Sequence, residues 1–170
     1  MSDRCRRLYP NSTHDKTSNL PVPPPPPQSS GVSVTDNVIE AFNNFKLKKE
    51  PHKLRYFIYK LSDDKKFIDI ESQGDLSKTY EDFVEALPEN ECRYGLIDIE
   101  FQTNDGRPSS KIVFITWVPD TSAIKGKMLY SSSKEALKRV LVGVGIHLNA
   151  TDAAELDFEE SILPAVKKFA

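Results

Sequence analysis

The feature that most limits how this chain can fold is a run of five consecutive prolines, Pro23–Pro27. Proline lacks the backbone N–H that helices and sheets require, so such a run favours an extended polyproline II conformation. Seven of the twelve prolines lie within residues 1–31, and residues 1–30 contain no glycine. We therefore expect residues 1–29 to form a disordered tail and residues 30–170 to form one domain.

The tail has two possible roles. It can serve as an extended spacer, which we favour because proline-rich chains are stiff and solvated. Alternatively, it can be a ligand for a partner whose groove is lined with aromatic side chains, since such grooves recognise polyproline II helices. A partner of this kind would bind Pro21, Pro23, Pro24, Pro25, Pro26 and Pro27.

Charge is divided unevenly between tail and domain. The whole chain has a formal net charge of −2. The first 30 residues carry four basic and two acidic side chains, and the rest carry 19 and 23, which gives +2 for the tail and −4 for the domain. General nucleic-acid binders are strongly basic, so we expect no nucleic-acid partner. A basic patch on this domain must therefore be local.

Cysteine content and apolar runs indicate the compartment. Cys5 and Cys92 are too few and too far apart for a disulfide framework, which favours a reduced intracellular protein. The longest apolar run, Ile112–Val118, has seven residues and is too short for a transmembrane segment. The first residues also lack the apolar core of a secretory signal. These features together predict a cytoplasmic protein.

Hydrophobic periodicity predicts an α/β domain. Apolar residues at helical spacing predict helices over residues 35–47, 77–87, 121–142 and 155–168. Alternating or continuous β-branched and aromatic residues predict strands over residues 55–61, 67–70, 92–101, 111–118 and 146–148. The strand over 111–118 is apolar on both sides and needs cover on both faces. We therefore expect a mixed sheet of about five strands with helices on both faces.

The sequence contains no familiar catalytic motif. It lacks a nucleophile elbow, a Walker loop, a dinucleotide-binding glycine pattern and a zinc-binding His-Glu-x-x-His. We expect Cys92 to be a small core residue rather than a nucleophile. Asp98 and Glu100 have the spacing of paired carboxylates, but a solvated strand end explains them more simply. We therefore expect no catalytic residue, metal site or cofactor; an enzyme with an unrecognised site is the last alternative.

One face of the third expected helix concentrates positive charge. Four residues recur at spacings that place them on one narrow line of a helix, the basic stripe: Lys127, Ser131, Lys134 and Lys138. Lys125 and Arg139 widen this stripe, and we expect Met128 to be exposed beside it. The core-facing stripe lies elsewhere: Ala136, Leu137, Val140, Leu141 and Val144. Two interpretations stay open, a solvated face or an interface for an acidic partner.

Three segments of the domain resemble one protein family. Ser30–Val34 opens the domain, Leu87–Tyr94 precedes the third expected strand, and Ser110–Arg139 contains Trp-x-Pro-Asp followed by Lys-Met-x-Tyr-x-Ser-Ser-Lys. Together they resemble the actin-depolymerising factor/cofilin family, and the fungal cofilins most closely. The resemblance implies a cofilin fold and a non-enzymatic monomer that binds actin monomers and filaments, and that severs and depolymerises filaments. It also implies a place at the actin cytoskeleton, with the nuclear matrix as a further location.

The resemblance also implies binding residues. The surface for actin monomers would use Ser30, Gly31, Lys125, Lys127, Met128, Lys134, Glu135, Lys138 and Arg139. Phosphoinositide headgroups would bind Lys125, Lys127, Lys134, Lys138 and Arg139. The filament surface would use Arg107, Lys111, Glu159, Glu160, Lys167 and Lys168. Ser30 is a candidate phosphorylation site, because about −2 of charge there would oppose an acidic partner.

Three features depart from the family pattern. Ser30 follows a 29-residue tail, whereas family members usually begin close to this serine. Ser109 stands where a basic residue is usual, and Leu163 and Pro164 stand where the last helix usually offers charge. Pro164 inside a helix is expected to cost about 3 kcal/mol or to kink the helix. These departures leave open a coactosin-like protein, which binds filaments without depolymerising them.

Overall fold

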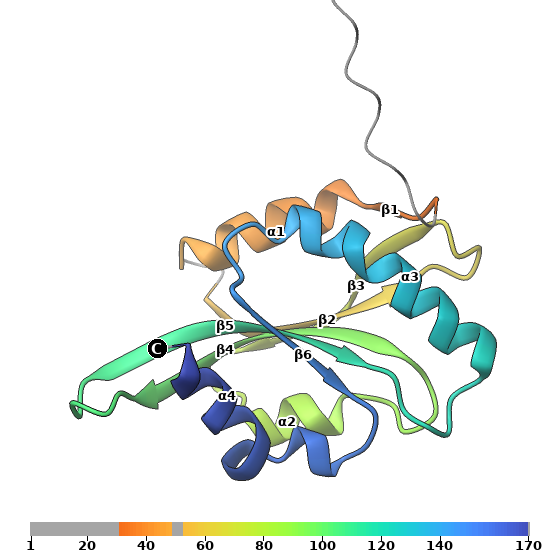
Figure 1. The fold of residues 1–170 in the computed structure, drawn as a ribbon. Helices are drawn as coiled ribbons and strands as arrows, with labels where there is room; N and C mark the ends of the chain where they lie inside the picture. Colours follow the sequence, from red (N-terminus) through yellow and green to blue (C-terminus); the bar gives the residue numbers. More distant parts are fainter. Residues whose placement is uncertain (1–30, 49–52, 170) are drawn as a thin grey trace, which may run out of the picture.

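The computed structural model describes residues 31–48 and 53–169. Ser30 and the expected proline-rich tail lie outside the described residues. The elements, drawn in Figure 1, follow the order β1 (Ser33–Val34), α1 (Asp36–Lys46), β2 (Leu54–Leu61), β3 (Phe67–Asp75), α2 (Tyr80–Glu85), β4 (Arg93–Gln102), β5 (Pro108–Trp117), α3 (Ile124–Val140), β6 (Ile146–Ala150), η1 (Ala154–Leu156), η2 (Phe158–Ile162) and α4 (Leu163–Lys168).

The strands form one mixed sheet in the order β1-β3-β2-β4-β5-β6. The inner pairs are antiparallel, whereas β1 runs parallel to β3 and β6 runs parallel to β5. The predicted fold class is confirmed, and the sheet has one strand more than expected. That strand, β1, has two residues that pair with Phe67 and Ile68. A strand so short carries no periodicity that a sequence pattern can detect.

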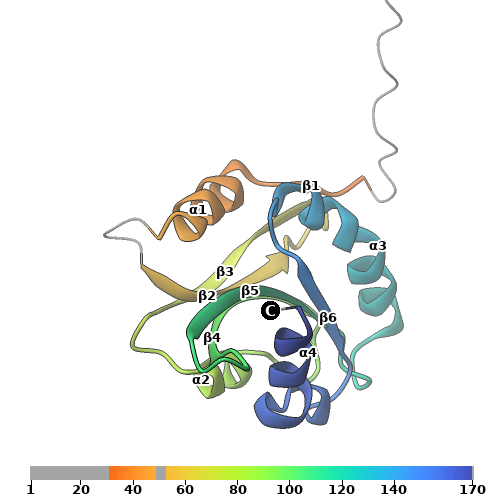
Figure 2. The same ribbon diagram turned by 60° about the vertical axis from the view of Figure 1, so that its left-hand side comes forward.

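Helices cover both faces of the sheet, as expected. Figures 1 and 2 show α1 and α3 on one face, and α2 and α4 on the other. Strand β4 supplies both cores: Leu96 packs under α1 and α3, whereas its neighbour Ile97 packs on the side of α2 and α4. Each pair of helices covers a separate hydrophobic core. Phe42 and Leu137 lie in the core under α1 and α3, and Phe83 and Val166 lie in the core under α2 and α4.

The sequence pattern predicts one continuous last helix over residues 155–168, and this prediction is wrong. Residues 154–156 form a 3₁₀ turn, residues 158–162 a π-helix, and an α-helix follows over Leu163–Lys168. The Ile162 N–H donates to the Asp157 carbonyl, five residues back, at 3.0 Å. Pro164 lies in the first turn of α4, where its missing N–H disturbs helical bonding least.

Two further expectations need correction. Strand β3 continues to Asp75, beyond the expected end at residue 70, because its polar residues occupy the exposed positions of a paired strand. Asp98 does not lie at a solvated strand end: it is 8% exposed, and its Oδ2 is 3.2 Å from the Nζ of Lys48 at the end of α1. Glu100 does have an exposed side chain. Cys92 is buried, as expected.

Candidate functional site

Helix α3 separates a core side from a basic side. Tyr130, Ser133 and Leu137 are buried beneath the helix. Beyond its end, Leu141 and Val144 are buried as predicted, and Ala136 and Val140 are half-buried. The members of the basic stripe lie away from this core: Ser131 is exposed, and Lys127, Lys134 and Lys138 are half-buried. The spacing argument therefore predicts the orientation of the helix correctly.

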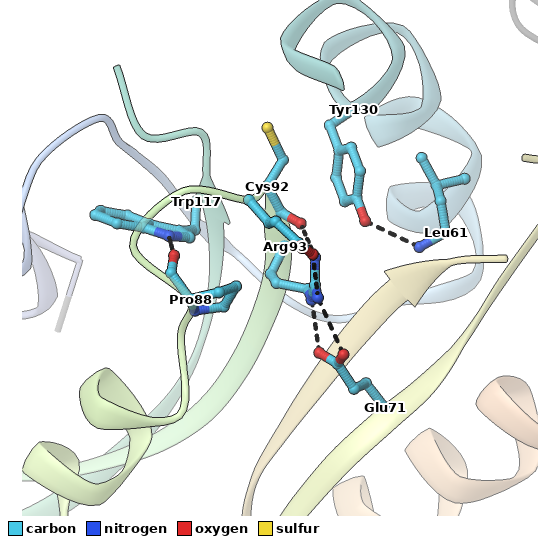
Figure 3. Close-up of polar contacts among 8 residues, drawn as sticks. Leu61, Glu71, Pro88, Cys92, Arg93, Trp117 and Tyr130 are labelled. Atoms are coloured by element: carbon cyan, nitrogen blue, oxygen red, sulfur yellow. Dashed lines mark hydrogen bonds and ion pairs between the residues drawn. The ribbon is translucent and has the colours of Figure 1, made fainter. Parts of the chain in front are cut away.

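Polar contacts between α3 and the sheet fix the helix in place. The Leu61 N–H donates to Tyr130 Oη at 3.0 Å (Figure 3), and Tyr94 Oη donates to the Tyr130 carbonyl. Burial raises the pKa of both phenols, which keeps the Tyr94 hydroxyl protonated and able to donate. At the far end of α3, Lys46 Nζ donates to the Val142 carbonyl at 2.9 Å.

Further polar contacts fix the ends of β4 and β5, the second of which leads into the segment before α3. Arg93 pairs with Glu71 through its Nε at 2.6 Å and donates to the Cys92 carbonyl at 2.7 Å (Figure 3). Trp117 Nε1 donates to the Pro88 carbonyl at 2.7 Å. The Arg93–Glu71 pair joins the start of β4 to β3. The Trp117 bond joins the end of β5 to the loop between α2 and β4. The strand ends that lead towards α3 are therefore fixed by side-chain hydrogen bonds.

Each lysine of the basic stripe has a nearby acceptor. Lys127 Nζ donates to the Asp120 carbonyl at 2.8 Å and lies 3.6 Å from Asp120 Oδ1. Lys138 Nζ lies 3.3 Å from Glu135 Oε1, one turn earlier on α3. Lys134 Nζ donates to Asn149 Oδ1 of β6 at 2.8 Å. The stripe is thus anchored to its surroundings rather than extended freely into solvent. Asn149 was not among the predicted residues.

Apolar side chains lie beside this positive charge. Met128 is 68% exposed, as expected, and Ile124 is 75% exposed one turn before it. Ile124 was not among the predicted site residues. The remaining predicted contacts on α3 are exposed: Lys125, Glu135 and Arg139. Exposed methionine side chains are enriched at protein interfaces.

The start of the domain comes close to the same helix. Gly31 is exposed and has a φ of +68°, a left-handed conformation that glycine adopts readily. Strand β1 follows it and is in contact with α3. The chain therefore enters the domain at Gly31, close to α3. Ser30, which precedes it, lies outside the described residues.

Only some of the predicted filament-binding residues lie together, and they lie away from α3. Arg107 and Lys167 line one hollow of about 400 Å³, together with Ser109. Lys168 is exposed on α4, and Lys111 is half-buried on β5 opposite Ile99. Glu159 and Glu160 are exposed in η2, at the other end of the last helical segment. The hollow therefore unites two predicted cations across 60 residues of sequence.

Residues 31–48 and 53–169 contain no group of three or more His, Cys, Asp or Glu side chains arranged to hold a metal ion. Over the same ranges, no helix has the length and apolarity needed to cross a membrane.

Comparison with known proteins identifies the family. Residues 31–163 match the family described as cofilin/tropomyosin-type actin-binding protein. The chain is 42% identical to actophorin from Acanthamoeba castellanii over 139 residues, which cover 82% of this chain and 97% of actophorin. It is also 42% identical to cofilin from Yarrowia lipolytica over 140 residues, which cover 82% and 88% of the two chains.

A solved structure agrees with these relatives. The crystal structure of Streptomyces griseoflavus cofilin superposes with a TM-score of 0.72 at 35% sequence identity, covering 79% of this chain and 97% of that one. Both the fold and the sequence support the resemblance carried by the Trp-x-Pro-Asp and Lys-Met-x-Tyr segments. The chain belongs to the actin-depolymerising factor/cofilin family, whose members are actin-binding proteins and not enzymes.

Proposed function

We propose that this protein binds actin monomers and filaments, and severs and depolymerises the filaments. The observation that carries the proposal is the basic side of α3, where three anchored lysines lie beside the exposed Ile124 and Met128. The monomer-type surface consists of Ser30, Gly31, Lys125, Lys127, Met128, Lys134, Glu135, Lys138 and Arg139.

Charge complementarity explains why an acidic domain carries this surface. Actin is acidic, so the partner and the domain repel each other except where positive charge is concentrated. A local basic stripe then selects the binding orientation and speeds association at low salt. The apolar side chains at its margin add area that is buried on binding.

A second surface is proposed for filament binding. Arg107 and Lys167, which share a hollow, are its strongest members. Lys111, Lys168, Glu159 and Glu160 are proposed contacts with less geometric support. Ser109 lines the same hollow without contributing charge. This missing cation favours the alternative function, a coactosin-like protein that binds filaments without depolymerising them.

Regulation of the α3 surface is part of the proposal. Phosphoinositide headgroups would compete with actin for Lys125, Lys127, Lys134, Lys138 and Arg139, because anionic phosphates seek clustered cations. Phosphorylation of Ser30 would oppose the acidic partner. A polyproline-binding partner of the tail is a further proposal, to be tested by titrating labelled tail with profilin.

Two assays test the main proposal. Cosedimentation with actin filaments measures binding, and single-filament microscopy measures severing and loss of subunits from filament ends. We expect binding at micromolar concentration, together with filament cuts that become more frequent as protein is added. Binding without cuts or faster disassembly would support the coactosin-like alternative. Absence of both would refute the proposal.

A further inference from the structure

The three lysines of the basic stripe are held by chemically different acceptors. Lys127 donates to the Asp120 backbone carbonyl at 2.8 Å and lies 3.6 Å from the carboxylate of the same residue, and Lys138 lies 3.3 Å from the carboxylate of Glu135. Each of these carboxylates offsets part of the charge of the nearby lysine. Lys134 instead donates to the amide oxygen of Asn149, which accepts a hydrogen bond but has no net charge. The Asn149 bond therefore fixes the Lys134 ammonium without cancelling its charge.

Asn149 stands on a well-supported part of the sheet. It lies opposite Thr116 of β5 in the parallel pairing of β5 and β6. The carbonyl of the next residue, Ala150, accepts from the Val118 N–H at 2.9 Å, and the Thr151 carbonyl accepts from the Asp120 N–H at 3.1 Å. Ala150 itself is buried. A side chain on such a strand holds its partner in place better than one on a loop.

Positive charge dominates the surroundings of this bond. His147 lies on the same side of β6, with its ring 5.8 Å from that of Phe114. Burial lowers the pKa of His147, and the charges of Lys138 and Lys134 lower it further, against the opposing effects of a hydrogen bond to the Val144 backbone and of Glu135. Burial also lowers the pKa of Lys134 and Lys138 adds to that effect, whereas the carboxylate of Glu135 opposes it. An incoming carboxylate would relieve this repulsion.

We propose that Asn149 is a positioning residue for actin binding, which presents the Lys134 ammonium at a fixed place with its charge available to a carboxylate of the partner. The inference rests on the proposed function, because Lys134 is itself a proposed contact. A lysine that is already held loses less rotamer freedom on binding. Immobilising a flexible side chain lowers affinity by about two- to tenfold, so loss of the Asn149 bond should have an effect of this size.

A double-mutant cycle tests this role. Affinity for fluorescently labelled actin monomers is measured for the wild type, Asn149→Ala, Lys134→Met and the double variant. We expect Asn149→Ala to weaken binding about two- to tenfold in the wild-type background and to have no effect when Lys134 is Met. An equal loss in both backgrounds, or no loss in either, would overturn the proposal.

A second variant separates positioning from general support of the fold. Asn149→Asp keeps an acceptor for Lys134 and adds a carboxylate, so it should preserve or raise the melting temperature while weakening actin binding. A structural role alone would move stability and affinity in the same direction, and that result would contradict the inference.

The bond itself is observable without actin. The nitrogen-15 spectrum of the Lys134 ammonium should show slowed proton exchange in the wild type and faster exchange in Asn149→Ala. Equal proton exchange rates of the Lys134 ammonium in the wild type and in Asn149→Ala would show that the bond does not form. If Lys134→Met binds actin like the wild type, the inference fails while the proposed function stands. If the wild type itself binds no actin, both fail.

Discussion

Replacing Lys134 and Lys138 together by alanine should weaken actin binding strongly and leave the fold almost unchanged. The two ammonium groups bond to Asn149 at 2.8 Å and to Glu135 at 3.3 Å, and both bonds lie at the surface. Exposed pairs of this kind contribute roughly 0–1 kcal/mol each to stability. A total below about 2 kcal/mol should shift the melting temperature of this domain by only a few degrees.

The loss of binding should be much larger. Two unit charges about 4 Å apart interact with roughly 1 kcal/mol in water and about 4 kcal/mol near a protein surface. Desolvation offsets part of this attraction, which leaves about 1–2 kcal/mol for each lysine that meets an acidic group. The double variant should therefore bind actin between about thirtyfold and several hundredfold more weakly.

Titration with labelled actin monomers and filament cosedimentation measure this loss, and circular dichroism measures the melting temperature. Lys78→Ala is the control, because Lys78 is exposed in the loop before α2, and α2 covers the face of the sheet opposite to α3 (Figure 1). It should bind actin like the wild type. A double variant that unfolds would show that the stripe is structural. A folded double variant with wild-type affinity would show that the stripe is a solvated face.

Three further outcomes are expected. Gly95→Ala should destabilise the domain by about 1–3 kcal/mol in urea unfolding, because a Cβ there would lie 2.4 Å from Phe83 Cζ; an unchanged midpoint would contradict the packing. Burial raises the pKa of Tyr59, Tyr80, Tyr94 and Tyr130 above their ordinary value of 10.0. As the pH rises, these phenols ionise in the unfolded chain before they ionise in the folded protein. The free energy of unfolding should therefore stay constant below pH 10 and fall as the pH rises above it. Urea midpoints that stay constant from pH 8 to 11 would refute this. Deleting residues 1–28 should preserve the melting temperature and leave actin affinity unchanged or improved, whereas a large loss of affinity would make the tail part of the binding surface.

The sequence predicts α3 well because helix geometry relates spacing to direction. Lys127, Lys134 and Lys138 fall on one side at any reasonable choice of helix ends, so an error of two or three residues at each end does no harm. The alternation along β4 is equally robust, because a strand places neighbouring residues on opposite faces. These local rules locate the candidate surface before any fold is known.

The missed features depend on contacts between distant parts of the chain. Asn149 meets Lys134 only because β6 pairs in parallel with β5, a register that no local pattern specifies. Asp98 is buried and paired with Lys48, which follows α1 and lies 50 residues earlier in the sequence, so no local pattern indicates this partner. The last helix is broken at Asp157, which has an extended backbone and caps η2 by accepting from the Glu160 N–H; the sequence pattern over 155–168 does not indicate this break.

Oxidation footprinting of Met128 tests the central claim, that the basic side of α3 is the actin-binding surface, most directly. The Met128 side chain is 68% exposed in the free protein and reacts readily with hydroxyl radicals in that state. Leu76, which is 47% exposed in the loop before α2, serves as the internal reference. At saturating actin, Met128 should become strongly protected while Leu76 keeps its reactivity. Unchanged oxidation of Met128 in the actin complex would contradict the account.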